Sequence, residues 1–295
     1  MAQKSIFITI IGKPNVGKSS LLNVLVGEKI AAVSDKPQTT RTRITGVLTK
    51  DETQFVFFDT PGMHKAKNKL GEHMVKAVNE TVSDIDVALL VVDCTKKISE
   101  IELDLIRNIK SAKAKAMLIL NKIDLLDDKS RLLSLISEYS ELCDWLCVIP
   151  VSIIENDGVD IVMNELERSA VEGPHYFPND MLTDQPEKVI AAEIVREKFL
   201  RLLSDEVPHG IAVSIEKMRE REDKDLLDIV AEIYCERDSH KGIIIGKNGS
   251  MLKKAASMAR EELESFFQIK INLQCWVKVK EGWRNREGLI KNFGL

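Results

Sequence analysis

No stretch of this 295-residue sequence approaches the roughly 18 consecutive apolar residues that a membrane-spanning helix needs. The N-terminal run SIFITII is too short for such a helix and leads directly into Gly-Lys-Pro. We therefore expect a first strand here rather than a signal peptide, and no transmembrane segment in the chain.

Cysteine is also scarce: the five residues are odd in number and contain no Cys-x-x-Cys pair. This pattern argues against a disulfide framework or a metal site and favours a reducing, cytoplasmic environment. Cys143 and Cys147 are four residues apart, which is the spacing of one helix face, and this favours core packing over metal binding. The five histidines form no cluster, and the chain has no internal repeat or low-complexity tract.

Charge is unevenly distributed along the chain. The net charge is −4, yet residues 241–291 contain eleven Lys or Arg against five Glu. A mildly acidic protein with a basic C-terminal stretch is predicted to bind a polyanion locally. No heptad pattern or large apolar surface stripe calls for an oligomer, so a monomer is expected.

The first part of the chain alternates short apolar runs with helical patterns. The runs are IFITII, QFVFFD, VALLVVD, AMLILN and LCVIPVS. Such strands, separated by helices, predict an α/β domain over residues 1–172 with a mostly parallel sheet covered on both faces. Three prolines in GPHYFPNDMLTDQP predict a linker over residues 173–186.

The pattern changes in residues 187–295. A helical stripe comes first, followed by IAVSI and IVAEIYCE, which are joined by the charged REREDKD and predict an antiparallel hairpin. In IKINLQCWVKVK, apolar residues occupy every second position. A smaller α+β domain is therefore predicted, with one face of its sheet buried. The stripe consists of Ala191, Val195, Phe199 and Leu202.

GKPNVGKS, Gly12 to Ser19, matches the phosphate-binding motif G-x-x-x-x-G-K-[ST] between a predicted strand and a predicted helix. Its glycines let backbone amides turn toward a phosphate, and the helix N-terminus adds its dipole. Lys18 is predicted to bridge the β- and γ-phosphates, and the Ser19 hydroxyl to hold Mg²⁺.

NKID, Asn121 to Asp124, follows the predicted strand AMLIL. The Asp124 carboxylate can accept hydrogen bonds from both N1–H and N2–H₂ of guanine, a donor pair that adenine lacks. Asn and Asp after a strand are usually turn formers, so the motif alone is weak. Behind a phosphate loop and DTPG, it predicts guanine selectivity.

With GKPNVGKS, DTPG and NKID, the chain resembles the TRAFAC-class GTPases. The resemblance implies that Asp59 reaches Mg²⁺ through water, that the Gly62 amide contacts the γ-phosphate, and that residues 33–43 form a first switch segment in which Thr40 completes the Mg²⁺ shell. VSI, Val151 to Ile153, stands where the fifth motif usually reads Ser-Ala, so Ile153 departs from the pattern. Expected metal ligands are Ser19, Thr40 and Asp59. Expected nucleotide contacts are Gly12, Lys13, Pro14, Asn15, Val16, Gly17, Lys18, Ser19, Ser20, Asp59, Thr60, Pro61, Gly62, Asn121, Lys122, Asp124, Val151, Ser152 and Ile153.

The second domain contains Gly246-Lys247-Asn248-Gly249 between an apolar turn and a long predicted helix. A lone GxxG is weak, but its setting in a helix, hairpin, two helices and strand resembles a KH domain of the αββααβ type. The resemblance implies that this loop grips the backbone of single-stranded nucleic acid. Lys253, Lys254, Arg284 and Arg286 extend the predicted basic track, although each is equally well explained as solvated surface.

Both domains and the linker together resemble bacterial GTPases that end in a KH domain. That resemblance implies binding near the 3′ end of 16S ribosomal RNA, a role in maturation of the small ribosomal subunit, and peripheral contact with the inner membrane. The hypothesis is a GTP-hydrolysing RNA-binding switch with Mg²⁺ as its cofactor. Two alternatives are a non-hydrolysing GTP sensor that signals through a protein or membrane partner, and a GTPase of tRNA modification.

Met63, after Gly62, cannot orient an attacking water, and His64 is a weak substitute. Slow intrinsic hydrolysis is therefore expected. In relatives with PNVGKS, the asparagine that matches Asn15 helps to bind K⁺ beside the phosphates, which implies faster hydrolysis in K⁺ than in Na⁺. The residues expected to act in catalysis are Asn15, Lys18, Thr40 and Gly62.

Overall fold

The structure is a computed structural model, in which the chain forms two compact units. Described in it are residues 2–36, 38–62, 69, 70, 74, 85–128 and 130–293. As far as these ranges extend, unit 1 comprises residues 1–31, 40–65 and 73–184, and unit 2 comprises residues 32–39, 66–72 and 185–295. Within the described ranges, every helix is too short or too polar to cross a membrane.

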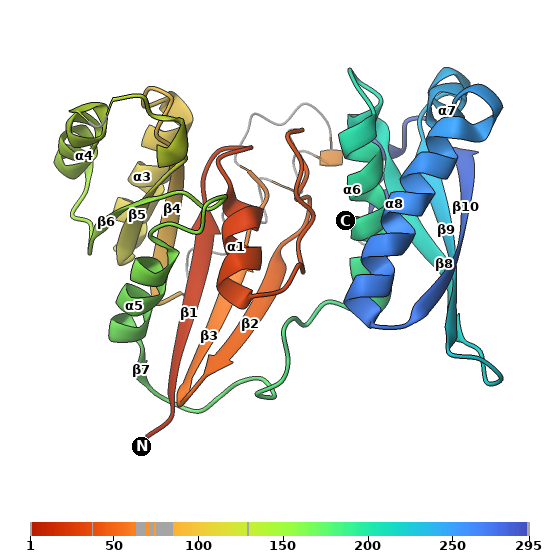
Figure 1. Ribbon diagram of the computed structural model, residues 1–295. Coiled ribbons are helices and arrows are strands. Elements are labelled where there is room, and N and C mark those ends of the chain that lie inside the picture. The colour runs from red at the N-terminus through yellow and green to blue at the C-terminus, as the bar shows by residue number, and fades with distance from the viewer. Residues whose placement is uncertain are drawn as a thin grey trace. The chain divides into compact units, whose positions relative to one another are not determined.

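Unit 1 is built on a sheet whose central strands come from the predicted apolar runs (Figure 1). In the described residues the sheet has seven strands, with β2-β3-β1-β4-β5-β6 as its main order. Neighbours from β3 to β6 are parallel, which confirms the predicted mostly parallel sheet. These strands are β1 (Lys4–Ile11), β3 (Thr53–Asp59), β4 (Val87–Asp93), β5 (Ala116–Asn121) and β6 (Val148–Val151).

Two strands of this sheet were not predicted. β2 (Ile44–Lys50) runs antiparallel to β3 at the edge, and the short β7 (Val171–Glu172) pairs antiparallel with the start of β1. Mixed sheets with an antiparallel edge strand are common in α/β proteins. Because β2 is the edge strand, its outer backbone groups are open to further pairing, and the Val47 N–H donates to the Leu182 carbonyl at 2.8 Å.

Helices cover both faces of the sheet, as predicted. On one face, leucines and valines of α1 and α5 pack against isoleucines of β1; on the other, α3 and α4 pack against β4 and β5. The short 3₁₀ turn η1 follows β5. Their bounds are α1 (Lys18–Val26), α3 (Glu100–Ala112), η1 (Ile123–Leu125), α4 (Ser130–Leu142) and α5 (Val159–Ser169).

Cys143 and Cys147 do not share a helix face, so that part of the prediction is wrong. Helix α4 ends at Leu142, and both cysteines lie in the connection to β6. Cys143 packs against the core under α3 and α4, whereas Cys147 packs against the core under α1 and α5. Both side chains are thus core residues, on opposite faces of the sheet.

Unit 2 has the predicted αββααβ order (Figure 1). Its sheet runs β10-β9-β8, with the predicted antiparallel hairpin between β8 and β9 and a parallel pairing of β9 with β10. The elements are α6 (Glu187–Leu202), β8 (Ala212–Glu220), β9 (Leu226–Cys235), α7 (Asp238–Ile245), α8 (Ser250–Phe267), β10 (Lys270–Val279) and, after it, α9 (Glu287–Asn292).

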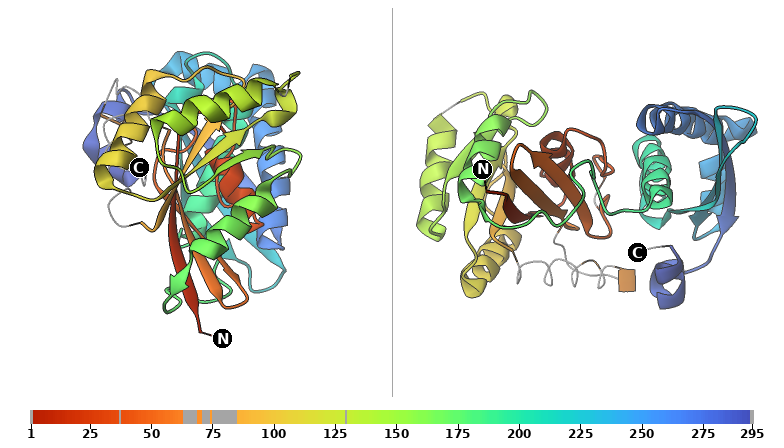
Figure 2. Two further views of the ribbon diagram at one scale, coloured as in Figure 1. Left: turned by 90° about the vertical axis from the view of Figure 1, so that its left-hand side faces the viewer. Right: turned by 90° about the horizontal axis from the view of Figure 1, so that it is seen from below.

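One face of this sheet is buried beneath α6 and α8 (Figure 2, right). Ala191, Val195 and Phe199 of the predicted stripe are 0% exposed, and Leu202 packs against the same core. On the open face, Trp276 of β10 is 59% exposed, whereas Ile271 on the covered face is buried. The alternation of apolar residues in β10 therefore predicted correctly that one face of this sheet is buried.

Candidate functional site

Two glycines shape the loop between β1 and α1. Gly12 has φ 154° and Gly17 has φ 106°, which L side chains rarely adopt. A Cβ on Gly12 would lie 2.4 Å from the Val91 carbonyl oxygen, and one on Gly17 would lie 2.4 Å from Asn121 Nδ2. The loop therefore takes its shape only with glycine at both positions, and α1 begins directly after it, at Lys18.

Three oxygen-bearing side chains from separate segments meet beside this loop. Ser19 Oγ lies 2.7 Å from Thr40 Oγ1 and donates to Asp59 Oδ2 at 2.5 Å, and Thr40 Oγ1 is 3.4 Å from Asp59 Oδ2. Asp59 is 0% exposed, and within the described residues its Oδ1 has no hydrogen-bond partner. Carboxylate and hydroxyl oxygens are the ligands that Mg²⁺ prefers, so these residues fit that ion.

The charges next to these oxygens are strongly perturbed. Lys18 Nζ donates to the Lys13 carbonyl at 2.9 Å. Burial lowers the pKa of Lys18 to about 8 and raises that of Asp59 to about 6, while their mutual attraction opposes both shifts. Each side chain is thus held in a site that disfavours its charged form.

NKID and the segment after β6 form a second part of the site. Asn121 Nδ2 donates to the Val16 carbonyl at 2.7 Å, which ties this segment to the phosphate loop. Ser152 Oγ donates to Asp124 Oδ1 at 2.7 Å, and this bond holds the carboxylate that is predicted to read the base.

Ile153, which departs from the usual Ser-Ala pattern, is accommodated through its backbone. Its N–H donates to Asn121 Oδ1 at 3.3 Å, and its side chain is buried in the core under α1 and α5. Because the contact uses the amide, the side chain at this position is free to pack as core.

Asp93, at the end of β4, was not identified from the sequence. Lys122 Nζ donates to its Oδ2 at 2.7 Å, and both the N–H and the hydroxyl of Thr95 donate to its Oδ1. Burial pushes the pKa of Asp93 upward, but these hydrogen bonds outweigh burial and lower it. No motif marks Asp93 in the sequence, because its place beside Asn121 depends on the register of β4 and β5.

The predicted first switch segment, residues 33–43, is divided between the two units. Residues 32–39 belong to unit 2, where the Val33 N–H donates to Glu197 at 3.0 Å and Arg196 donates to the Thr39 carbonyl. From residue 40 onward the segment belongs to unit 1, where the Arg43 guanidinium lies 4.7 Å from the centre of the Phe58 ring. Met63 and His64, which bear on the expected slow hydrolysis, lie outside the described residues.

In unit 2 the GKNG turn joins α7 to α8. Gly246 and Gly249 have φ 72° and 76°, and a Cβ on Gly246 would lie 2.7 Å from the Cβ of Met251. Lys247 on the turn is exposed, as are Lys253 and Lys254 in the first turns of α8. A tight glycine turn with adjacent lysines therefore exists where the sequence predicted it.

The two arginines of the predicted basic track differ. Arg284 forms an ion pair with Glu236 and is only partly exposed, so much of its charge is already compensated. Arg286 is exposed at the N-cap of α9.

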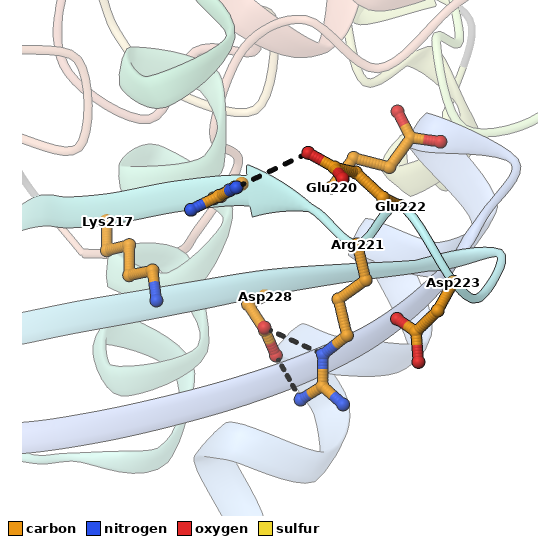
Figure 3. A pocket seen from close by; sticks show the side chains of 7 residues that line it. Lys217, Glu220, Arg221, Glu222, Asp223 and Asp228 are labelled. Carbon is orange, nitrogen blue, oxygen red and sulfur yellow. Dashed lines mark hydrogen bonds and ion pairs between the residues drawn. The ribbon is translucent and has the colours of Figure 1, made fainter.

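The β8–β9 hairpin borders a shallow hollow of about 290 Å³ lined by charged residues (Figure 3). Arg221 makes two hydrogen bonds of 2.8 Å to Asp228, and these bonds hold the pKa of that carboxyl well below its usual range. Arg219 lies 3.6 Å from Glu222. Ion pairs thus line this hollow. Its lining residues, 217–228, precede the GKNG turn in the sequence.

Comparison with known proteins gives the same two-part division. The family described as 50S ribosome-binding GTPase matches residues 7–122, and the KH domain family matches residues 206–284. The chain is 52% identical to the GTPase Era of Clostridioides difficile (strain 630) over 291 residues, which are 99% of this chain and 98% of that protein. It is 51% identical to the GTPase Era of Ruminiclostridium cellulolyticum over 294 residues, which are 100% of this chain and 98% of that protein.

Two solved structures are similar over nearly the whole chain. Each has a TM-score of 0.95 and 36% identity, and covers 99% of both chains. One is Era in complex with MgGDPNP and nucleotides 1506–1542 of 16S ribosomal RNA. The other is a variant of Aquifex aeolicus Era bound to GDP and aluminium fluoride. The predicted resemblance to GTPases that end in a KH domain is thereby confirmed.

Proposed function

The chain belongs to the Era family of GTPases, and we propose that it uses GTP binding and hydrolysis to control its contact with the 3′ region of 16S ribosomal RNA during maturation of the small subunit. The observation that carries this proposal is the meeting of Ser19, Thr40 and Asp59 in one unit of a chain whose other unit has a KH fold. These three residues come from the phosphate loop, the first switch segment and DTPG, so one bound nucleotide with its Mg²⁺ would contact all three segments.

In this proposal Lys18 leaves the Lys13 carbonyl and binds the β- and γ-phosphates, while Ser19, Thr40 and Asp59 hold Mg²⁺. The bound ion neutralises the charge that develops on the phosphates during hydrolysis. Asp124 reads the guanine base with support from the Ser152 hydroxyl. Ordering of Thr40 and Gly62 by GTP, and their release after hydrolysis, provides the switch.

The RNA contact is assigned to the GKNG turn with Lys247, Lys253 and Lys254. It is supported by the positive φ angles of both glycines and by the relative that was solved with 16S ribosomal RNA. An aspartate at either glycine places a carboxylate against the RNA phosphates, where repulsion opposes binding.

The test is binding of an RNA with the sequence of the 16S 3′ end, in the presence of a non-hydrolysable GTP analogue. The double variant Gly246→Asp and Gly249→Asp should lose at least tenfold in affinity. Gly27→Asp is the control for an aspartate placed at a glycine, because Gly27 also has a positive φ, has open space at its Cβ and lies in unit 1. Equal affinities of the double variant and the wild type would show that the turn is not the RNA site.

K⁺ is proposed as a second activating ion beside Asn15, which has φ 64° in the phosphate loop. The support is the PNVGKS motif, and the physical reason is that a cation beside the phosphates supplies the positive charge of an arginine finger. Phosphate release should be faster in KCl than in NaCl at equal ionic strength, and Asn15→Ala should remove the difference. Equal rates of the wild type in the two salts would refute this assignment.

Two finer statements also stand as proposals. Peripheral contact with the inner membrane predicts co-sedimentation with vesicles of anionic lipid, and a monomeric state predicts a mass near 33.2 kDa by light scattering. The alternative of a GTP sensor that does not hydrolyse is less well supported, because full-length relatives are described as GTPases. Measured phosphate release, with and without small ribosomal subunits, separates the two.

A further inference from the structure

A buried carboxylate outside the recognised motifs contacts the phosphate loop. Glu102, in the first turn of α3, is 1% exposed. The N–H and hydroxyl of Ser99 donate to its Oε2 at 2.7 and 2.8 Å. Its Oε1 lies 3.4 Å from Nζ of Lys13, whose side chain is 19% exposed. Both carboxylate oxygens therefore have partners, one at the helix N-terminus and one in the phosphate loop.

The outer half of the phosphate loop is thus held at several points. The Lys13 side chain pairs with Glu102, and the Lys13 carbonyl accepts from Lys18. The next residue, Pro14, is in close contact with DTPG, because a Cβ on Gly62 would lie 2.7 Å from the Pro14 nitrogen and 2.8 Å from its Cα. A displacement of residues 13 and 14 would therefore move the surface on which Gly62 rests.

We propose that Glu102 is a positioning residue for GTP hydrolysis, which acts through Lys13 to fix the backbone of residues 13 and 14 on which Gly62 packs. The inference rests on the proposed placement of the γ-phosphate at the Gly62 amide. A buried carboxylate in the first turn of a helix has a fixed position, so it can hold the ammonium group of Lys13 in one place. A lysine on a loop without such a partner is mobile. Loss of the ion pair disturbs the γ-phosphate side of the site, while Gly17, Lys18 and Ser19 still form the cradle for the β-phosphate.

The experiment compares Glu102→Gln with the wild-type protein. Glutamine keeps the size of the side chain and an oxygen that accepts from Ser99, but removes the charge that attracts Lys13. Steady-state phosphate release gives kcat and KM, and calorimetry gives Kd for GDP and for a non-hydrolysable GTP analogue. We expect kcat to fall about ten- to a hundredfold, because small misplacements at a reacting centre have effects of this size. The Kd for GDP should change less than about threefold, because the residues that cradle the β-phosphate do not contact Glu102 and the effects of distant sites are nearly independent.

Glu100→Gln is the matched control, because Glu100 lies in the same first turn of α3 and is exposed. It removes the same charge near the same helix N-terminus and should leave kcat unchanged. Lys13→Gln should reproduce the loss seen with Glu102→Gln, and the double variant should be no worse than either single one, because the two residues act as a pair. If Glu102→Gln does not fold, Lys13→Gln performs the test through kcat, and it supports the proposal only if Kd for GDP and for the GTP analogue stays within about threefold of wild type, because a larger change would show a direct nucleotide contact of Lys13.

Three results would overturn the proposal. The first is a kcat within twofold of wild type in Lys13→Gln or a folded Glu102→Gln protein. The second is an equal loss in Glu100→Gln, which would trace the effect to helix charge. The third is additive losses in the double variant. A wild-type protein without GTPase activity would instead count against the proposed function, so the two failures are distinguishable.

Discussion

Replacement of Asp124 by Asn should change the base that the site prefers. Ser152 Oγ already donates to Asp124 Oδ1, and a carboxylate has further lone pairs that can accept from the N1–H and N2–H₂ donors of guanine. Hydrogen bonds to a charged group contribute about 1.5–3 kcal/mol each. An amide keeps one neutral acceptor but sets its NH₂ against a guanine donor. One charged hydrogen bond is lost and a donor is left unpaired, which together cost about 3–6 kcal/mol. This corresponds to a GDP Kd that is about 10²- to 10⁴-fold higher.

Xanthosine diphosphate provides the complementary measurement, because xanthine has a carbonyl where guanine has the 2-amino group. The asparagine NH₂ can donate to that carbonyl, so Asp124→Asn should bind this nucleotide better than the wild type does. Titration calorimetry with both nucleotides measures the reversal. Ser152→Ala is the control: it removes one neutral donor and should weaken both nucleotides alike, by about fivefold. An unchanged preference for guanine in Asp124→Asn would refute the assignment of this carboxylate as the base reader.

Three further outcomes are expected from contacts in the two units. Gly17→Ala should raise the Kd for GDP at least about tenfold in calorimetry, because the new Cβ would lie 2.4 Å from Asn121 Nδ2 at a φ of 106°. An unchanged Kd would show that the loop can accommodate the methyl group. Trp283→Phe should destabilise unit 2 by about 1–3 kcal/mol in urea unfolding, since it removes the Nε1 donor to the buried Gly210 carbonyl at 2.9 Å; an unchanged midpoint would refute the contact. Asp93→Asn should lower stability by about 1 kcal/mol at neutral pH. Because the folded-state pKa of Asp93 is lowered, this difference should fade as the pH falls below about 4, and a constant difference would contradict it.

The fold was largely predictable because its strongest signals are local. Buried parallel strands such as VALLVVD read as continuous apolar runs, and β10 alternates because only one of its faces is covered. β2 was missed since ITGVLTK mixes polar and apolar residues, and its place at the sheet edge depends on pairing with β3. The spacing of Cys143 and Cys147 gave a wrong prediction of a shared helix face. A period of four indicates a helix face only where a helix exists, and α4 ends at Leu142, one residue before Cys143.

The site was predictable where a motif encodes backbone shape together with chemistry. The glycines of GKPNVGKS and GKNG, and the meeting of Ser19 with Asp59, follow from such motifs. Asp93 and Glu102 could not be found in this way, because the lysine that each of them contacts lies far away in the sequence. Their roles depend on strand register and helix docking, and an isolated Asp or Glu most often marks a solvated surface.

The buried charges of the nucleotide site also bear on how its ligands cooperate. Lys18 and Asp59 are both buried, and burial drives the pKa of each toward the neutral form, so their attraction only partly compensates for lost hydration. A phosphate supplies the negative charge that Lys18 lacks, and Mg²⁺ supplies the positive charge that Asp59 lacks. If the phosphate binds alone, it attracts Lys18 and leaves the buried charge of Asp59 uncompensated. If Mg²⁺ binds alone, it attracts Asp59 and leaves the buried charge of Lys18 uncompensated. Binding of both together leaves neither charge uncompensated, so nucleotide and metal should bind cooperatively. The Asp59 carboxylate also accepts hydrogen bonds from Ser19 and Thr40, the two other expected Mg²⁺ ligands.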